Sequence, residues 1–288
     1  MTGRTILVCG AGLMGHGIAQ VMAGAGHRVL LYEPEPARAE QGRQRIASSL
    51  ERAVGKGKIT SEDRESQLAR IGVAGSLADA AAQAELIVEA VFEDEDVKRR
   101  LFGELDGVAA EGAVLASNTS SISITRLAAA VSPERRARFV GLHFFSPVPV
   151  MPLIELIRGA ETDDATEAFV RELAAELGKQ VIVSRDRPGF IVNRMIMPLL
   201  AEAMRAFEEG LASAEDIDTG ARVGLNHPMG PLELADFIGL DVCLHIMQVL
   251  NEGFGGQHLP PPPILRQLVD AGHLGQKTGQ GFYRYPRD

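Results

Sequence analysis

The sequence predicts an α/β protein in which a mostly parallel, doubly wound sheet is followed by a smaller all-α domain. Short apolar runs alternate with helical patterns as far as residue 187, which favours a parallel sheet with helices on both faces. From residue 188 onward the pattern is almost entirely helical. The length of 288 residues also exceeds one typical domain. We therefore expect two domains, residues 1–187 and 188–288.

The strands of the first domain are predicted from apolar runs that lie between turn residues. They cover residues 5–9, 29–32, 71–73, 86–89, 114–116, 139–142, 153–157 and 181–183. The helices begin near residue 13 and continue at residues 36–70, 94–108, 123–130 and 166–177. In the second domain, the prolines at 260–263 predict a stiff extended connector, with a polyproline ligand site as the alternative.

A glycine-rich turn follows the first strand and opens the first helix. Gly10 permits a tight turn, Gly12 lets a pyrophosphate approach the backbone, and Gly15 allows the helix to pack closely on the strand. The phosphates would lie at the positive end of the helix, against Leu13 and Met14. This strand–turn–helix context favours a dinucleotide-binding, Rossmann-type domain over an ordinary structural turn.

The end of the second strand indicates which dinucleotide is bound. Glu33 can accept hydrogen bonds from both adenosine ribose hydroxyls and would repel a 2′-phosphate. The sequence therefore predicts NAD as the cofactor, although Arg38 lies close enough in sequence to keep NADP open.

Composition and charge indicate which binding partners and which cellular compartment to expect. The net charge of −9 predicts no nucleic-acid partner. We expect no signal peptide, because no basic, apolar and cleavage-site pattern is visible before the first predicted strand. The longest apolar stretch, residues 190–207, contains Arg194 and Glu202 and is predicted to be a buried helix with no membrane role. Cys9 and Cys243 are expected to be free buried thiols, which fits the cytoplasm.

The helix at 190–207 is apolar on nearly every side, so it must be covered all round. A domain of about a hundred residues covers little by itself. We therefore expect a homodimer that forms through the C-terminal helices.

His143 and Glu155 form the first candidate for chemistry. His143 ends a predicted strand, at the rim where open α/β sheets bind ligands, and Glu155 is a charge inside an apolar strand. If they pair, the imidazole becomes a suitable base for removing a proton from an alcohol while hydride leaves for NAD. A core histidine bonded to a backbone carbonyl, with Glu155 on an exposed edge, accounts equally well for the spacing.

Two further polar groups stand in unusual places. Hydroxyl and amide residues at 117–121 follow a strand and precede a helix, where capping that helix is the simplest role. Asn193 lies on the most apolar helix and must find a buried partner or a ligand.

Several motifs in one order match a known family. They lie at residues 10–15, 88–91 with Glu93 and Lys98, 117–121, 141–147, 188–194, 228–231, 239–241 and 277–279. On these motifs the chain resembles, over its whole length, the NAD-dependent 3-hydroxyacyl-CoA dehydrogenases, including the bacterial 3-hydroxybutyryl-CoA dehydrogenases.

The resemblance implies a role for each matching residue. His143 would be the catalytic base with Glu155 as its partner, and Ser120 and Asn193 would position the substrate hydroxyl and thioester. The remaining positions would bind cofactor or coenzyme A: Glu33, Glu93, Lys98, Ser120 and Lys277 at NAD, and Ser49, Lys56 and Ser120 at CoA. A solvated surface side chain is the simpler role for Lys56.

The chain departs from the family near the proposed base. Ser146 stands where the family often has an asparagine that faces the nicotinamide, and a hydroxyl or a water can substitute there. Pro152 replaces a common lysine, and the loop near residues 132–136 is slightly longer.

The resemblance implies reversible oxidation of a short-chain (3S)-hydroxyacyl-CoA, such as 3-hydroxybutyryl-CoA, to the 3-ketoacyl-CoA. That chemistry serves fatty-acid β-oxidation and butanoate metabolism alike. A dehydrogenase of a free hydroxy or sugar acid on the same fold is the nearest alternative, and a non-catalytic NAD-binding protein is the alternative from another class. No metal site is predicted.

Overall fold

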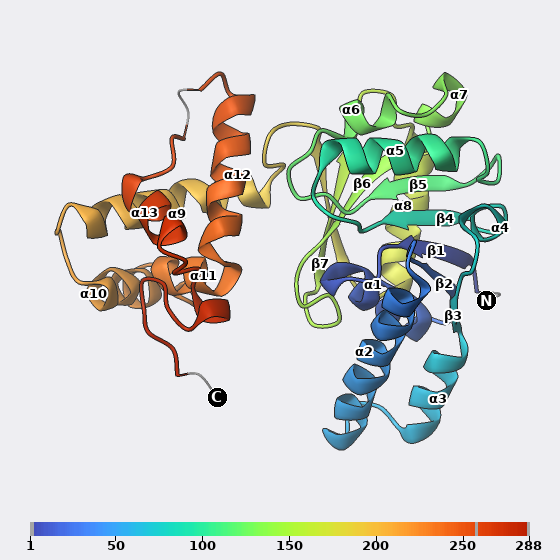
Figure 1. Cartoon of the computed structure of the whole chain (residues 1–288), viewed down its shortest axis with the longest axis horizontal. Coiled ribbons are helices and arrows are strands. Elements are labelled where there is room, and N and C mark those ends of the chain that lie inside the picture. Colours follow the sequence, from blue (N-terminus) through green and yellow to red (C-terminus); the bar gives the residue numbers. More distant parts are fainter. Residues whose placement is uncertain (1–2, 257–258, 287–288) are drawn as a thin grey trace. The chain divides into compact units, whose positions relative to one another are not determined.

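A computed structural model describes residues 3–256 and 259–286. The chain divides into two compact units, Met1–Arg187 and Pro188–Asp288. In Figure 1 the first unit runs from blue to yellow and the second from orange to red.

The first unit is built on one eight-stranded sheet with the order β3-β2-β1-β4-β5-β6-β7-β8. Its strands are β1 (Thr5–Cys9), β2 (Arg28–Tyr32), β3 (Ile71–Val73), β4 (Leu86–Glu89), β5 (Val114–Ser117), β6 (Phe139–Phe144), β7 (Leu153–Arg158) and β8 (Gln180–Arg185). Neighbouring strands are parallel except β6 and β7, which are antiparallel. The predicted Rossmann-type, mostly parallel sheet is confirmed, and its strand order reverses between β1 and β4.

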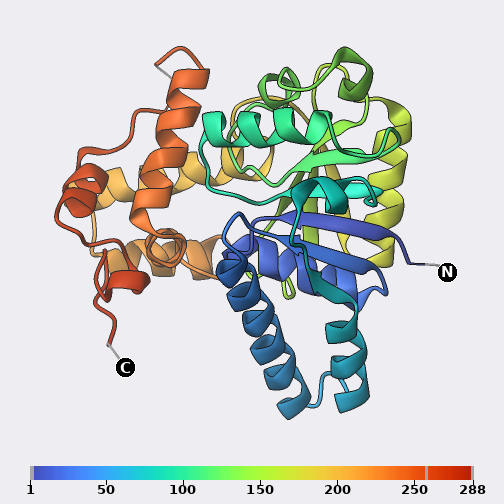
Figure 2. The same cartoon turned by 45° about the vertical axis from the view of Figure 1, so that its right-hand side comes forward.

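The helices of the first unit are α1 (Leu13–Gly24), α2 (Pro36–Gly55), α3 (Ser61–Ala69), α4 (Leu77–Ala81), α5 (Glu95–Asp106), α6 (Ile124–Ala128), α7 (Pro133–Arg136) and α8 (Asp164–Glu176). The excursion predicted at 36–70 is the helix pair α2 and α3, which project side by side from the sheet in Figures 1 and 2. Thr60 begins α3 with a capping box to Asp63. The short alanine-rich helix α4 was not predicted from the sequence.

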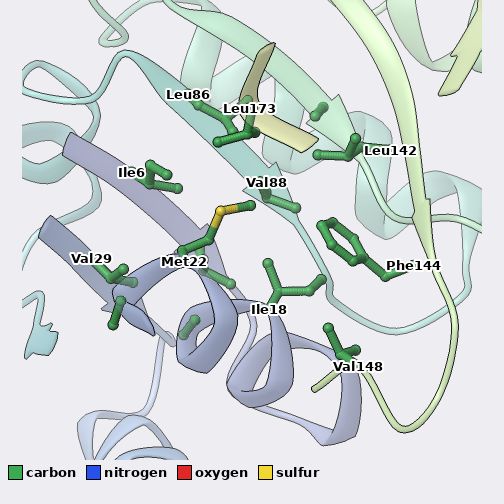
Figure 3. Packing of buried hydrophobic residues seen from close by; sticks show 14 of the residues in the cluster. Ile6, Ile18, Met22, Val29, Leu86, Val88, Leu142, Phe144, Val148 and Leu173 are labelled. Atoms are coloured by element: carbon green, nitrogen blue, oxygen red, sulfur yellow. The ribbon is translucent and has the colours of Figure 1, made fainter. Parts of the chain in front are cut away.

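The core fixes the position of the first helix. Ile18 and Met22 of α1 are fully buried and lie against Ile6, Val29 and Val88 of the neighbouring strands (Figure 3). Burial of each such side chain contributes about 1.5–3 kcal/mol. This packing holds the N-terminus of α1 at the carboxyl ends of β1 and β4.

The two faces of the sheet are covered differently. The cluster that contains α1 also takes side chains from α2 and α8, whereas Phe102 of α5 packs on Phe139 with ring centroids 4.6 Å apart. Leu142 and Ile154 belong to the α1 cluster. Since alternate residues of a strand point to opposite faces, the residues next to them, at 143 and 155, point to the face that bears α5.

The second unit is helical in its described residues, as predicted. It contains α9 (Val192–Glu208), α10 (Ala214–Thr219), the π-helical turn η1 (Gly220–Gly224), α11 (Pro231–Ile238), α12 (Leu240–Gly253), α13 (Pro263–Asp270) and the 3₁₀ turn η2 (Gln276–Thr278). Its core joins α9, α11 and α12 through side chains such as Leu200, Leu232 and Met247. In the predicted proline connector, residues 259–262 belong to no helix or strand, Pro262 has an extended conformation (φ −57°, ψ 141°), and Pro263 is the first residue of α13.

The expectation that the first C-terminal helix is apolar all round is wrong. α9 buries one face, which includes Met197 and Leu200, whereas Arg194, Met195 and Glu202 are exposed. The cause is the helical period, which gathers the polar residues of this segment on the side away from the core.

Two fully buried carboxylates hold the C-terminal segment of the second unit. Asp218 accepts a hydrogen bond from the Tyr283 hydroxyl at 2.8 Å, and Asp236 accepts one from the Tyr285 hydroxyl at 3.0 Å. Asp236 also accepts the backbone N–H groups of Phe282 and Tyr283. The segment that follows α13 is thereby fixed on α10 and α11.

Both cysteines, Cys9 and Cys243, are buried and free, as predicted. Of the helices within residues 3–256 and 259–286, none is both long enough and apolar enough to cross a membrane.

Candidate active site

His143 and Glu155 lie directly opposite each other on β6 and β7. The ring Nδ1 is 2.8 Å from Glu155 Oε2, and the Glu155 side chain is fully buried. Because β8 pairs with the other side of β7, Glu155 is not on a sheet edge. The alternative with Glu155 on an exposed edge is therefore wrong. Since Nδ1 faces the Glu155 carboxylate, Nε2 is the ring nitrogen that would exchange a proton with a substrate.

Asn118 follows β5 and connects the end of that strand to the end of β6, which carries His143. Its Oδ1 accepts the backbone N–H of Phe144 at 2.9 Å, which ties the end of β6 to the end of β5. Sequence analysis did not single out Asn118 as a site residue. Its place immediately after a buried strand was the available signal.

The glycine loop has the geometry that a dinucleotide requires. Gly10 has a φ of +106°, and a Cβ on Gly15 would overlap the carbonyl oxygen of Gly10, so only glycine fits at either position. A Cβ on Gly12, by contrast, would meet nothing within 4 Å, which leaves its backbone open to a ligand. Leu13 is 68% exposed and Met14 is half-buried at the start of α1. Among the residues that the structure describes, no side chain caps this helix.

Glu33, the residue predicted to bind the ribose, lies at this loop. Its Oε1 accepts the backbone N–H of Ala11 at 2.8 Å, which brings the carboxylate to the glycine turn. Arg38 instead has its guanidinium 6.0 Å from the ring centroid of Phe92, an exposed aromatic side chain. The acidic group is thus the one fixed beside the loop, which fits the ribose of NAD.

A second cluster of charged residues follows β4. Glu89 is fully buried and accepts hydrogen bonds from Lys98 Nζ at 2.6 Å, from Ser117 Oγ at 2.6 Å and from the Val91 N–H at 2.7 Å. Lys98 is 1% exposed and lies 3.2 Å from Glu93 Oε2. Burial raises the pKa of Glu89 even though Lys98 opposes the shift.

Glu93 carries the contact from this cluster to the residues at 117–121. Its Oε1 accepts hydrogen bonds from the Thr119 hydroxyl at 2.6 Å and from the Ser120 backbone N–H at 2.8 Å. Burial acts to raise the pKa of Glu93, but Lys98, Thr119 and Ser120 outweigh burial, so the pKa is lowered. Glu93 is therefore an ionised acceptor at neutral pH.

The capping role considered for residues 117–121 is wrong. Ser123 caps α6 by accepting the Arg126 N–H at 3.2 Å, and Asp186 accepts the Ile124 and Thr125 N–H groups. The Ser117 hydroxyl bonds instead to Glu89, and the hydroxyls of Thr119, Ser120 and Ser121 bond to Glu93. Glu89 was missed as a site residue, although a charge inside an apolar strand was the same signal that selected Glu155.

A basic groove of about 450 Å³ lies along α2, lined by His16, Gln41, Gln44, Arg45, Ser48 and Arg52. Ser49 is half-buried and Lys56 is exposed. Each follows an arginine of the groove by four residues, so Ser49 lies beside the groove on α2 and Lys56 lies at the C-cap of that helix. The groove's two arginines were not predicted.

Three predicted site residues, Ser146, Asn193 and Lys277, come later in the chain than the clusters described above. Ser146 is exposed after β6. Asn193 is 8% exposed on α9, and Lys277 in η2 bonds to Asp241 at 2.5 and 2.7 Å, both within the second unit. Across the two described ranges, His, Cys, Asp and Glu side chains form no group of three that could hold a metal ion.

Known families match both units. The 3-hydroxyacyl-CoA dehydrogenase NAD-binding domain matches residues 5–187, and the C-terminal domain of the same family matches residues 189–285. A 3-hydroxybutyryl-CoA dehydrogenase of Bradyrhizobium diazoefficiens is 51% identical over 98% of this chain and 95% of its own length. Another from Mycobacterium tuberculosis is 49% identical over 96% of this chain and 97% of its own.

A solved structure gives the same result. The (S)-3-hydroxybutyryl-CoA dehydrogenase PaaH1 of Ralstonia eutropha is 46% identical, covers 99% of each chain and has a TM-score of 0.94. With the glycine loop, Glu33 and the NAD-binding family model all in agreement, NAD is the cofactor. The chain belongs to the 3-hydroxyacyl-CoA dehydrogenase family and is an NAD-dependent oxidoreductase.

Proposed function

We propose that this enzyme interconverts short-chain (3S)-hydroxyacyl-CoA and 3-ketoacyl-CoA, with 3-hydroxybutyryl-CoA as the representative substrate. The His143–Glu155 contact carries the proposal, because it provides a positioned acid–base group on the rim of the NAD-binding sheet. The names of the relatives support the same substrate class.

His143 exchanges the proton of the reaction. NAD, held at the glycine loop, would supply the acceptor for the hydride that leaves C3 of the hydroxyacyl group. Nε2 of His143 takes the hydroxyl proton, while Glu155 on Nδ1 fixes the tautomer and stabilises the positive charge that the ring gains. In the reverse direction the same nitrogen returns a proton to the ketone oxygen.

The cofactor is assigned to the glycine loop and to the carboxylates beside it. Gly10, Gly12 and Gly15, with Leu13 and Met14, would hold the pyrophosphate at the start of α1. The other proposed NAD contacts are Glu33, Glu93, Lys98, Ser120, Ser146 and Lys277. Among these, Lys98 acts on the cofactor mainly through Glu93, because its ammonium is buried between two carboxylates.

We assign four residues to the substrate: two at its reacting end and two at its CoA tail. Ser120 and Asn193 would position the hydroxyl and the thioester. Ser49 and Lys56 would contact CoA, beside the groove of Arg45 and Arg52. A groove with two guanidinium groups suits a phosphate-rich coenzyme tail, which the net charge of −9 would otherwise repel.

We also propose an oligomeric state and a cellular compartment for the enzyme. Large apolar side chains of the second unit, among them Leu211, Val223 and Leu225, are more than half exposed, which supports a homodimer through this unit. Two free buried thiols support a reducing cytoplasm. Fatty-acid β-oxidation and butanoate metabolism both use the proposed reaction.

Oxidation of NADH with acetoacetyl-CoA tests the proposal. Free acetoacetate in place of the thioester, and NADPH in place of NADH, are the controls. Turnover that requires both the thioester and NADH supports the proposal. Turnover of the free acid alone would instead indicate a dehydrogenase of hydroxy or sugar acids.

A further inference from the structure

Glu93 Oε1 receives more hydrogen-bond donors than one oxygen can bind strongly. Thr119 Oγ1 at 2.6 Å and the Ser120 N–H at 2.8 Å are joined by the hydroxyls of Ser120 at 3.1 Å and Ser121 at 3.3 Å. A carboxylate oxygen has two lone pairs, and strong O–H···O bonds are near 2.7–2.8 Å. The backbone N–H of Ser120 thus makes a short bond to Oε1, whereas the Ser120 hydroxyl makes one of the two longer bonds to the same oxygen.

The orientation of Glu93 is fixed from behind. Lys98 Nζ lies between Glu89 Oε1 at 2.6 Å and Glu93 Oε2 at 3.2 Å, and both Lys98 and Glu89 are essentially fully buried. A buried ammonium keeps its carboxylate partners because an unpaired charge there is costly. With Oε2 directed at Lys98, Oε1 must face the serines.

Glu93 is nevertheless accessible to a ligand. Its side chain is 29% exposed, in contrast to Glu89 at 0%. Ser120 is half-buried beside it. A hydroxyl donor that approaches from the open side would therefore compete with the weakly held Ser120 hydroxyl for Oε1.

We propose that Glu93 couples cofactor binding to substrate binding through Ser120. When a ribose hydroxyl of the cofactor donates to Oε1, the Ser120 hydroxyl is displaced and turns to the acyl substrate. Glu89 and Lys98 are positioning residues that keep Oε1 directed at Ser120. This inference rests on the proposed function, which assigns Glu93 to NAD and Ser120 to the substrate.

The proposed coupling between cofactor binding and substrate binding is positive and acts in both directions. Bound cofactor increases the affinity for substrate, and bound substrate increases the affinity for cofactor by the same factor. In the cofactor-free enzyme the Ser120 hydroxyl stays on Glu93 and contributes little to substrate binding. A serine that merely shapes its loop, or that contacts substrate in both states, gives no such difference.

Calorimetric titration with acetoacetyl-CoA tests the coupling. NAD and acetoacetyl-CoA are both oxidised and cannot react together, so the dissociation constant can be measured with and without saturating NAD. For the wild-type enzyme we expect NAD to tighten binding by about 5- to 150-fold. For Ser120→Ala we expect a coupling factor within about twofold of one.

Two further variants complete the cycle. Glu93→Gln should lose the coupling as well, and the double variant should lose no more, since both changes remove the same link. Ser132→Ala is the matched control, because Ser132 bonds to Asp106 at the start of α7 and should retain the wild-type coupling.

Equal weakening by Ser120→Ala in the presence and absence of NAD would overturn the coupling while leaving the proposed function intact. Independent binding of the two ligands to the wild-type enzyme would do the same. If the wild-type enzyme binds no acetoacetyl-CoA and does not turn it over with NADH, the proposed function fails, and the coupling fails with it.

Discussion

His143 and Glu155 face each other across the antiparallel β6–β7 pair, with Nδ1 2.8 Å from Oε2. Their neighbours Leu142 and Ile154 point into the core on the other face of the sheet. A shift of register by one residue would bury the imidazole in that core and separate the two groups. The same packing that stabilises the sheet therefore sets the geometry of the acid–base pair.

The glycine loop predicts two different outcomes for the same substitution. Gly12→Ala places a methyl group in open space, so the fold should be retained while the pyrophosphate is kept from the backbone. Gly15→Ala overlaps the Gly10 carbonyl and should lower the free energy of unfolding by about 1–3 kcal/mol. NADH titration and urea denaturation of both variants separate these effects. Equal loss of stability in both would contradict the assignment of Gly12 to the cofactor.

Lys98 should be essential for stability. Lys98→Met leaves the fully buried Glu89 carboxylate without its counter-charge and removes the ammonium partner of Glu93. Breaking a buried pair in this way costs about 3–5 kcal/mol. Denaturation of Lys98→Met, with the exposed Lys58→Met as control, measures the cost. A loss below about 1 kcal/mol would show that Lys98 behaves as a surface lysine does.

His27 predicts a loss of stability in mild acid. Its Nδ1 accepts the Arg4 N–H at 3.3 Å, and burial lowers the pKa of the ring against the opposing pull of Glu176. A base with a lowered pKa binds fewer protons when folded, so its contribution is present above the ordinary pKa of 6.5 and is lost below it. The unfolding free energy should fall from pH 6.5 downward by at most about 1.4 kcal/mol per pH unit.

His27→Gln is the variant that checks this slope. A glutamine oxygen can still accept the Arg4 N–H, but it takes up no proton in this range. The variant should therefore lose the slope between pH 6.5 and the lowered pKa while the acid loss due to carboxylates remains. An identical slope in both proteins would assign it to another group.

The basic groove on α2 predicts an effect that depends on the coenzyme tail. Arg45→Ala and Arg52→Ala should each raise KM for acetoacetyl-CoA by roughly fivefold, the value of an exposed ion pair. KM for an acetoacetyl thioester of N-acetylcysteamine, which lacks the phosphates, should be unchanged. Arg43→Ala, which removes an arginine paired with Glu40 on another side of α2, is the control. A rise in KM for both thioesters would remove the groove from the CoA site.

The local parts of the site were predictable from sequence. Gly10, Gly12, Gly15 and Glu33 belong to one βαβ unit, so short-range pattern and spacing define both their conformation and their contacts. The proline connector and the free thiols were predictable for the same reason, because each depends on few neighbours.

The parts that depend on register or on long-range packing were not predictable. Spacing left the His143–Glu155 contact open because it requires the antiparallel register of β6 and β7. Glu89 was overlooked because its partners come from a helix and from the next strand. The one-sided burial of α9 escaped analysis because composition, unlike helical period, does not show which residues share a face.

The turnover of acetoacetyl-CoA with NADH by wild-type enzyme, His143→Gln and Glu155→Gln is the most direct measurement. We predict that His143→Gln lowers kcat by about 10²–10⁴-fold, because the positioned acid–base group is lost. Glu155→Gln should lower kcat by at least about tenfold, since the amide cannot stabilise the charged ring. NADH should bind both variants as it binds the wild type. Near wild-type kcat in a folded His143→Gln variant would contradict the assignment of the acid–base role to this pair.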